Sequence, residues 1–227
     1  MMTDTVTLSP SDLTFLWSEC PRCFYLKYKL QIKRPSAPFP SIFGKIDLLM
    51  KGYFAERSAD NLNPALPPGI ISFADRWVVS QPLKLAGHTL RCQLRGKFDS
   101  VIAFEDGSYG VVDFKTTDPK PAHVAFYGRQ LHAYALALEQ PAPGALLLSP
   151  ISRLGLFSVA PSGLEGLPDG RLAYTGAVTW QEIPRNDPAF LKFLGKVLTL
   201  LELPEPPPPG ETCEYCQYRE GARQHLF

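Results

Sequence analysis

The sequence predicts an α/β fold, in which a central mixed β-sheet is flanked by helices. Three observations support this prediction. Helical patterns lie at both ends of the chain, short apolar runs follow one another between residues 76 and 116, and Asp106-Gly107 is a turn typical of a β-hairpin. The length of 227 residues suits one large domain with a sizeable core. We therefore expect residues 1–227 to form a single domain.

The composition excludes several classes of protein. The chain has 23 Lys and Arg against 22 Asp and Glu, a net charge of +1, so any role with nucleic acid needs a local positive groove. No apolar run approaches the roughly 20 residues of a membrane span, and the first residues lack the pattern of a signal peptide. We expect a cytoplasmic protein without membrane contact, a compartment in which paired cysteines suggest metal binding more than disulfides.

Helices are expected at the start of the chain. Ser9 is placed to cap a helix that has Pro10 in its first turn, and Pro21 is expected to divide this stretch into two helical pieces. The second piece, with its Phe, Tyr and Lys residues, suits either an amphipathic core helix or a nucleic-acid contact. A basic, proline-rich connection over 31–40 then leads into a helical pattern over 42–54.

The middle of the chain is expected to form most of the sheet. We predict a loop over 61–69, strands over 76–80, 89–94, 97–104 and 109–116, and a helix over about 122–139. Further strands are expected at 146–148, 154–159 and 174–180. A last amphipathic helix begins at Asp187, with this aspartate as its cap, and ends at Leu203. A proline-rich spacer over 204–210 follows it.

Two aspartates and a lysine mark the predicted hairpin. Asp99 lies near the end of one apolar run. Asp113 and Lys115 lie two residues apart on the next, so their side chains point to the same face. Two carboxylates and an ammonium on one face are costly to hold together unless a hard cation lies between the acids. We therefore predict that Asp99 and Asp113 bind Mg²⁺ or Mn²⁺, with the carbonyl of Phe114 as a further ligand.

The lysine completes the chemistry of a hydrolase acting on phosphate. A bound metal makes hydroxide available near neutral pH, and Lys115 would orient or deprotonate the attacking water, or offset phosphate charge. The alternative is a surface hairpin with solvated charges. Apolar residues at the other positions of this strand favour a central strand instead.

The helix after this strand adds an amide and a phenol. Gln130 and Tyr134 lie one turn apart on the same face, where they can contact a DNA strand or steady the lysine. The alternative is a polar helix edge that meets solvent, with Tyr134 partly buried.

These elements, in this order, resemble the PD-(D/E)XK nuclease superfamily, and within it the RecB-like branch with the AddB-type and CRISPR-adaptation exonucleases. The matching motifs are Gly96-Lys97-Phe98-Asp99, Val112-Asp113-Phe114-Lys115-Thr116 and Gln130-x-x-x-Tyr134. The resemblance spans residues 20–216 and implies a restriction-endonuclease-like core. It also implies that Asp99 and Asp113 bind the metal, that Lys115 is catalytic, and that Gln130 and Tyr134 belong to the motif that distinguishes the branch.

The chain departs from this branch at one metal ligand. The branch usually carries a histidine on an early helix, shortly after a glycine, whereas this chain has Asp47 after Gly44. Asp is a hard oxygen ligand and can hold Mg²⁺ or Mn²⁺ in place of histidine. The alternative is a solvent-facing charge on the helix. We expect His123 and His132, on the later helix, to be surface or groove residues and not ligands.

The cysteines form two Cys-x-x-Cys pairs at opposite ends of the chain. The pairs are Cys20 with Cys23 and Cys213 with Cys216, and Cys92 is left unpaired. Four thiolates can close a tetrahedral Zn²⁺ site or hold an iron–sulfur cluster. We expect residues 1–30 and 204–227 to form a clasp through this site, because a cross-link that closes a long loop contributes most.

The arrangement of these cysteines also resembles that of the AddB-type and CRISPR-adaptation nucleases. They bind a [4Fe–4S] cluster with one early and three late cysteines, whereas this chain keeps the count of four in a two-plus-two distribution. The resemblance favours a [4Fe–4S] cluster here, with Zn²⁺ as the alternative.

The sequence thus predicts a metal-dependent DNA nuclease that hydrolyses phosphodiester bonds, an exonuclease on single strands or DNA ends. One alternative, favoured by the absent histidine, is a catalytically inactive nucleic-acid-binding or assembly module that keeps the nuclease fold. Another, a zinc-clasped interaction domain, leaves the carboxylate–lysine face unexplained. The resemblance also implies protein partners in DNA repair, recombination or CRISPR adaptation. A strand-binding groove is expected to include the following basic and aromatic residues: Arg22, Tyr25, Lys27, Arg95, Tyr127 and Arg129.

Overall fold

Two β-sheets and six α-helices make up the part of the chain that the computed structural model describes, residues 4–35, 40–117 and 121–225. The helices are α1 (Pro10–Glu19), α2 (Pro21–Lys29), α3 (Ser41–Phe54), α4 (Pro121–Glu139), α5 (Asp187–Glu202) and α6 (Glu214–Arg223). The larger sheet contains β2 (Gly69–Ala74), β6 (Ser100–Phe104), β7 (Tyr109–Lys115), β8 (Ile151–Gly166) and β9 (Leu172–Glu182). The smaller sheet contains β1 (Thr5–Leu8), β3 (Trp77–Val79), β4 (Leu83–Lys84) and β5 (Arg91–Lys97). Two 3₁₀ turns complete the set, η1 (Ala59–Asn61) and η2 (Pro168–Gly170).

The larger sheet is mixed and has the strand order β2-β6-β7-β8-β9. β6 and β7 form the predicted antiparallel hairpin, in which Ser100 lies opposite Val112. β7 and β8 are parallel, with Asp113 beside Leu156, and α4 is the helical crossover that a parallel pair requires. β9 then returns antiparallel to β8. The predicted mixed α/β architecture with flanking helices is confirmed.

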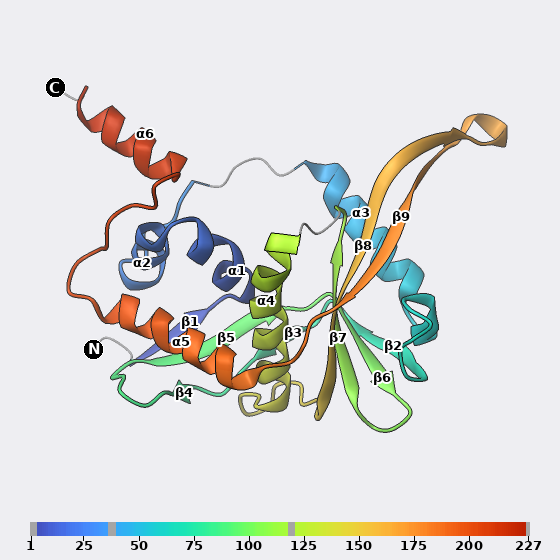
Figure 1. The fold of residues 1–227 in the computed structure, drawn as a ribbon, viewed down its shortest axis with the longest axis horizontal. Helices are drawn as coiled ribbons and strands as arrows, with labels where there is room; N and C mark the ends of the chain where they lie inside the picture. The colour runs from blue at the N-terminus through green and yellow to red at the C-terminus, as the bar shows by residue number, and fades with distance from the viewer. Residues whose placement is uncertain (1–3, 36–39, 118–120, 226–227) are drawn as a thin grey trace.

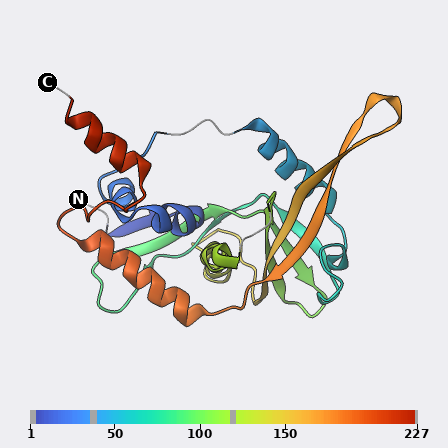
Figure 2. The ribbon, with the colours of Figure 1, turned by 45° about the horizontal axis from the view of Figure 1, so that its top comes forward.

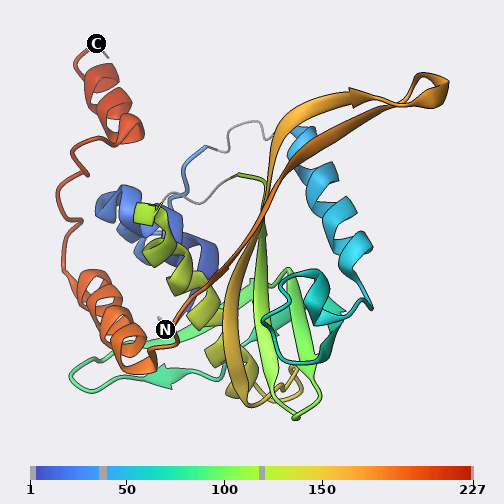
Figure 3. The same ribbon diagram turned by 45° about the vertical axis from the view of Figure 1, so that its right-hand side comes forward.

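Helices cover both faces of the larger sheet. α4 packs against β7 and β8 on one face, and against β3 and β5 of the smaller sheet, so that it lies between the two sheets (Figures 1 and 2). α3 lies on the opposite face of the larger sheet and packs against β7 (Figure 3). Among the described residues, no helix combines the length and apolar character needed to cross a membrane.

The alternation of side chains along β7 sends its residues to two separate cores. Val111 belongs to the core on the α4 side, together with Leu156 of the neighbouring strand. Val112 and Phe114 belong to the second core, which they share with Phe54 of α3. Because side chains alternate in a strand, Asp113 and Lys115 point with Val111 toward α4. The strand thus presents its charged residues to the helix that carries Gln130 and Tyr134.

Two parts of the chain extend away from these cores. β8 and β9 continue past the sheet as a two-stranded arm with η2 at its tip, and α6 projects at the opposite end of the molecule (Figure 1). The arm exposes Leu164, Leu172 and Tyr174.

The structure corrects several predicted elements. The segment 146–148 is not a strand, because its backbone lies in the loop after α4, where Leu148 N–H donates to Leu138 O at 3.1 Å. The cap of α5 is Asn186, whose side chain accepts from Ala189 N–H, and not Asp187. The predicted strand 97–104 is interrupted at Phe98 and Asp99, between β5 and β6.

Other elements were not predicted. β1 and β4 are too short to show a hydrophobic period, and β2 begins at the end of a segment that was expected to be a loop. The last helix, α6, has only Cys216 buried and therefore lacks the apolar face by which a helix is recognised in a sequence.

Candidate active site and cysteine cluster

Asp113 lies in the middle of β7 and is only 2% exposed. Its carboxylate forms an ion pair with Lys115 and accepts a hydrogen bond of 3.0 Å from Gln130 Nε2. Burial raises the pKa of Asp113 to about 6, against the opposing effect of the Lys115 charge, and the nearby charge of Asp99 raises it as well. Asp113 is therefore a buried carboxylate whose negative charge needs further compensation.

Asp99 lies in the turn between β5 and β6 and approaches Asp113 directly. A side-chain hydrogen bond between the two carboxyl groups is among the causes that raise the pKa of Asp113. Asp99 Oδ2 also accepts from Phe114 N–H at 2.9 Å, and Oδ1 lies 2.9 Å from Lys51 Nζ. The structure thus brings together the two acids that the sequence singled out, and the backbone N–H of Phe114 fixes one of them.

Lys115 lies between this acid pair and an aromatic ring. Its Nζ pairs with Asp113 and lies 4.6 Å from the centroid of the Tyr127 ring. Burial by itself lowers the pKa of Lys115, but the charges of Asp113 and Asp99 outweigh burial and raise it. Lys115 is therefore protonated at neutral pH, and in that state it donates hydrogen bonds and offsets negative charge, but does not accept a proton.

Gln130 and Tyr134 form a hydrogen-bonded series behind Asp113. Gln130 Nε2 contacts Asp113 at 3.0 Å and the Tyr134 hydroxyl at 3.3 Å, and that hydroxyl donates to Lys97 O at 2.9 Å. Both side chains are buried, so the alternative of a solvent-facing helix edge is wrong. Gln130 thus contacts the acid directly and Tyr134 contacts it through Gln130, while the predicted contacts with DNA or with the lysine stay predictions.

The acid pair meets the requirements of a divalent cation. Two carboxylates in contact, one of them buried, repel each other unless a proton or a cation lies between them. Gln130 Oε1 is also buried and has no hydrogen-bond partner in the described part of the chain. Carboxylate and amide oxygens are the ligands that Mg²⁺ and Mn²⁺ prefer. The residues therefore fit a hard metal ion at Asp99 and Asp113.

Asp47 lies on α3 close to this pair but contacts a lysine. Its Oδ2 is 2.7 Å from Lys51 Nζ, which also pairs with Asp99 and with Asp75. In the part of the chain that the structure describes, one group of three or more metal-binding side chains has all its ligand atoms within 4.8 Å of one another, and it is the cysteine group. The oxygens of Asp47, Asp99 and Asp113 are therefore spread over a wider distance than this. Sequence reasoning missed Lys51 and Asp75, which carry no motif.

The histidines do not line a groove as far as the structure describes them. His132 is buried, its Nδ1 lies 2.6 Å from Gly128 O, and its Nε2 accepts from Asn186 N–H at 2.8 Å. The prediction of a surface or groove position for His132 is therefore wrong, because this ring links α4 to the start of α5. The side chain of His123 lies outside the described residues.

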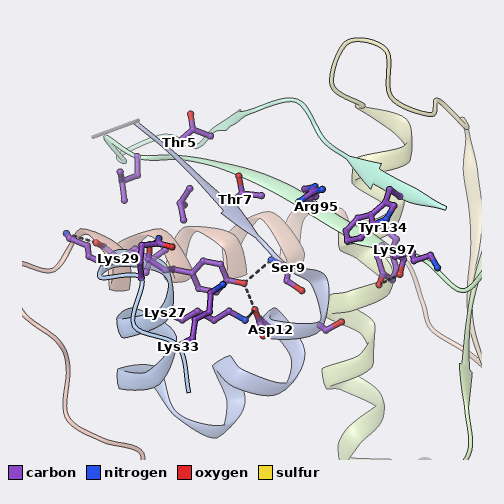
Figure 4. Close-up of a pocket in the computed structure, with 18 residues that line it drawn as sticks. Thr5, Thr7, Ser9, Asp12, Lys27, Lys29, Lys33, Arg95, Lys97 and Tyr134 are labelled. Carbon is purple, nitrogen blue, oxygen red and sulfur yellow. Dashed lines mark hydrogen bonds and ion pairs between the residues drawn. The ribbon is translucent and has the colours of Figure 1, made fainter. Parts of the chain in front are cut away.

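A groove of about 990 Å³ runs between β1, the end of α2 and β5 (Figure 4). Its basic lining residues are Lys27, Lys29, Lys33, Arg95 and Lys97. Tyr134 lies at the end of the groove beside Lys97, and Asp12 contacts Tyr28 in its interior. Trp77 lies in the wall, is 57% exposed, and has the Arg95 guanidinium 4.7 Å from its ring centroid.

Only part of the predicted strand-binding set lies in this groove. Lys27 and Arg95 line it. Tyr25 does not, because its ring is buried and its hydroxyl donates to Leu203 O at 3.0 Å. Arg129 lies on α4, where its guanidinium donates to Ser18 at 2.9 Å.

The four paired cysteines converge at the junction of α1, α2 and α6. Cys20 Sγ lies 3.8 Å from Cys216 Sγ, and Cys23 Sγ lies 3.8 Å from Cys213 Sγ and 3.6 Å from Cys216 Sγ. All four are buried. Cys20 is the N-cap of α2 and Cys213 the N-cap of α6, so each pair lies at a helix start, where a thiolate is favoured. The predicted joining of the two ends by a four-cysteine site is confirmed.

Hydrogen-bond donors surround these sulfurs. Cys23 N–H and Gly210 N–H donate to Cys20 Sγ at 3.4 and 3.3 Å, and Arg34 Nη2 donates to Cys213 Sγ at 3.1 Å. Burial by itself raises the pKa of Cys20, but the two backbone donors, together with the side chains of Cys213 and Cys23, outweigh it and lower this pKa to about 7. Such donors stabilise thiolates, which are the form that binds metal. Burial raises the pKa of Cys23 and of Cys216 in the same group, and it raises the pKa of Cys92, within the core, to about 11.

Three comparisons with known proteins bear on the family to which this chain belongs. No curated protein matches the chain. The crystal structure of SSO0001 is similar to it with a TM-score of 0.50 at 16% sequence identity, over 97% of this chain and 87% of that chain, a likeness that concerns the fold alone. A family model described as the PD-(D/E)XK nuclease superfamily matches residues 55–220, a span that contains both acids and the lysine. The chain therefore belongs to the PD-(D/E)XK nuclease superfamily.

Proposed function

We propose that this chain is a metal-dependent deoxyribonuclease of the RecB-like branch, which hydrolyses phosphodiester bonds in single strands or at DNA ends. Membership of the superfamily supports a metal-dependent nuclease in general. The observation that carries the proposal is the contact between Asp99 and Asp113, with Lys115 paired to the buried acid. A protein that only binds nucleic acid has no need of such a costly arrangement of charges.

In this proposal Asp99 and Asp113 hold Mg²⁺ or Mn²⁺, which supplies a hydroxide near neutral pH and stabilises charge on the phosphate. Lys115, protonated beside them, orients the attacking water by donating to it and offsets the charge that develops on the phosphate oxygens. Gln130 and Tyr134 keep the Asp113 carboxylate in one orientation. The ligand roles predicted for Asp47 and for the carbonyl of Phe114 stay predictions.

The basic groove supports a single polynucleotide strand as the substrate. It concentrates five cationic side chains in a protein whose net charge is only +1. Lys33 is exposed and is placed to contact phosphates, and the exposed ring of Trp77 offers a surface on which a base can stack. Lys97 and Tyr134 connect this groove to the acid pair through Gln130. The groove thus adjoins the acid pair through Tyr134, and its lining does not include Asp99, Asp113 or Lys115.

For the cysteines we propose a structural Zn²⁺ ion, in place of the [4Fe–4S] cluster that the resemblance favours. A tetrahedral ion with Zn–S bonds of about 2.3 Å has ligand sulfurs about 3.8 Å apart. The closest sulfur pairs here are separated by 3.6 to 3.8 Å. In a [4Fe–4S] cluster each cysteine binds a different iron atom, which holds the sulfurs farther apart. Elemental analysis decides the question: one zinc per chain supports the proposal, whereas iron with brown colour overturns it.

Cleavage of labelled DNA tests the nuclease. Wild-type protein with Mn²⁺ or Mg²⁺ is expected to degrade linear single strands and to leave circular single strands intact, because the proposed substrate has an end. Asp113→Ala and Lys115→Met are expected to abolish cleavage. Lys192→Met removes an exposed lysine of α5, outside the site, and serves as the matched control. Cleavage that persists in Asp113→Ala would refute the assigned site, and cleavage of circles would refute the requirement for an end.

A catalytically inactive binding module is the second candidate. Asp47, in place of the expected histidine, favours it, because the side chain is engaged with Lys51. Strand binding by the wild-type protein without cleavage under either metal would support this candidate over the nuclease.

A further inference from the structure

Lys51 of α3 gathers three acidic residues on the side of the active site away from Asp113. Its Nζ lies 2.7 Å from Asp47 Oδ2, 2.9 Å from Asp75 Oδ1 and 2.9 Å from Asp99 Oδ1. The side chain of Lys51 is only 11% exposed, so its ammonium is largely withdrawn from water. One ammonium thus contacts three carboxylate oxygens, which are spaced around it more widely than the ligands of one metal ion, because they do not all lie within 4.8 Å of one another.

The three acids come from separate elements of the fold. Asp47 lies on α3, Asp75 in the turn between β2 and β3, and Asp99 in the turn between β5 and β6. Asp75 has a left-handed backbone with φ of 55°, a conformation that aspartate tolerates better than most residues. Its N–H donates to Asp99 O at 3.1 Å, which fixes the two turns against each other. The carboxylates of Asp75 and Asp99 also have partners besides Lys51, since Asp75 pairs with Lys97 and Asp99 accepts from Phe114 N–H.

We propose that the Lys51 ammonium takes the place of a second metal ion, so that the active centre binds a single divalent ion, at Asp99 and Asp113. This inference rests on the proposed nuclease function. In two-metal sites the ions lie about 3.5–4 Å apart. Here Asp99 connects the two positions, because Oδ1 contacts Lys51 while its carboxyl group also meets Asp113.

The charge balance supports one ion. Four carboxylates meet three ammonium groups around the site, which leaves one negative charge for a divalent ion to neutralise. The carboxylates are those of Asp47, Asp75, Asp99 and Asp113, and the ammonium groups are those of Lys51, Lys97 and Lys115. One divalent ion brings this charge from −1 to +1, and a second would bring it to +3. Loss of Lys51 lowers the charge with two ions to +2 and, unlike loss of Lys97, also frees the three carboxylate oxygens that the Lys51 ammonium contacts.

The test counts Mn²⁺ ions bound per chain, by calorimetry and electron paramagnetic resonance, on protein whose cysteine site has been loaded with zinc. Wild-type protein is expected to bind one ion and Lys51→Met two. Lys51→Arg keeps the cation and is expected to bind one. Lys97→Met is the matched control: Lys97 pairs with Asp75 at 2.9 Å in the same cluster, but its removal leaves Lys51 in place, so one ion is expected.

The possible outcomes separate this inference from the proposed function. Two ions in wild type, or one ion in both wild type and Lys51→Met, would overturn the role of Lys51 while leaving a metal-binding active site. Wild-type protein that binds no Mn²⁺ would overturn the proposed function, and the inference with it. If Lys51→Met does not fold, the Mn²⁺ ions bound by Lys51→Gln are counted in its place. Two ions are then expected, and one ion would contradict the inference.

Discussion

Replacement of Asp113 by asparagine is expected to stabilise the metal-free protein while removing its metal site. The pKa of Asp113 is raised from 3.8 to about 6 in the folded chain, chiefly because the carboxylate is buried. A carboxyl group whose pKa is raised in the folded state destabilises the folded protein once it is ionised. This destabilisation is absent below pH 3.8, grows as the pH rises, and is complete above pH 6. Asparagine keeps the shape and the amide oxygen but carries no charge.

The size of the effect follows from the two pKa values. A difference of about 2 in pKa corresponds to about 3 kcal/mol. By linkage, Asp113 lowers the free energy of unfolding by about 1.5 kcal/mol at pH 5 and by about 3 kcal/mol at pH 8. For a chain of this length, 3 kcal/mol corresponds to roughly 6 to 12 °C in Tm. Asparagine at 113 also leaves Lys115 without its charged partner, a cost that does not depend on pH in this range.

The assay is chemical denaturation of wild type and Asp113→Asn between pH 5 and 8, in buffer without Mg²⁺ or Mn²⁺. The stability of the variant relative to wild type should rise by about 1.5 kcal/mol across this range, whatever the constant cost from Lys115. Asp169→Asn, at the exposed tip of the arm, controls for removal of a carboxylate and should show no such slope. A pH-independent difference between Asp113→Asn and wild type would refute the reasoning. Added Mn²⁺ should then stabilise wild type and not this variant.

Three further predictions address the other parts of the molecule. Gln130→Leu removes a hydrogen bond to the buried Asp113 carboxylate, and such a bond is worth about 1.5–3 kcal/mol. Calorimetry should therefore show that the affinity for Mn²⁺ falls by roughly tenfold to a hundredfold. An unchanged affinity would contradict the positioning role of Gln130. Cys216→Ser should lose the zinc and expose the last helix to limited proteolysis, whereas Cys92→Ser, buried elsewhere in the core, should keep full zinc content. Trp77→Ala should weaken single-strand binding by about 1–3 kcal/mol with little change in its salt dependence. Lys33→Ala should reduce the slope of log affinity against log salt by about 0.7, and both effects are measured by fluorescence anisotropy.

Local patterns in the sequence were sufficient for the central strand and the cysteine pairs. Asp113 and Lys115 share a face because side chains alternate in any strand, and their apolar neighbours place that strand inside the sheet. The spacing of two residues within each cysteine pair likewise needs only the start of a helix to bring both sulfurs to one side. β1 and β4 of the smaller sheet could not be predicted, because pairing with β5 and not their own composition makes them strands.

The sequence by itself determined the chemistry available to this protein: two acids and a lysine on one hairpin, an amide and a phenol on the next helix, and four thiols at the ends of the chain. The tertiary structure decided how these groups are used. Contacts between residues distant in the chain depend on how helices and turns pack, and no sequence period encodes them. Such packing turned Gln130 toward Asp113, brought Lys51 into contact with Asp99, and set the four cysteine sulfurs within 4.8 Å of one another, close enough to hold a metal.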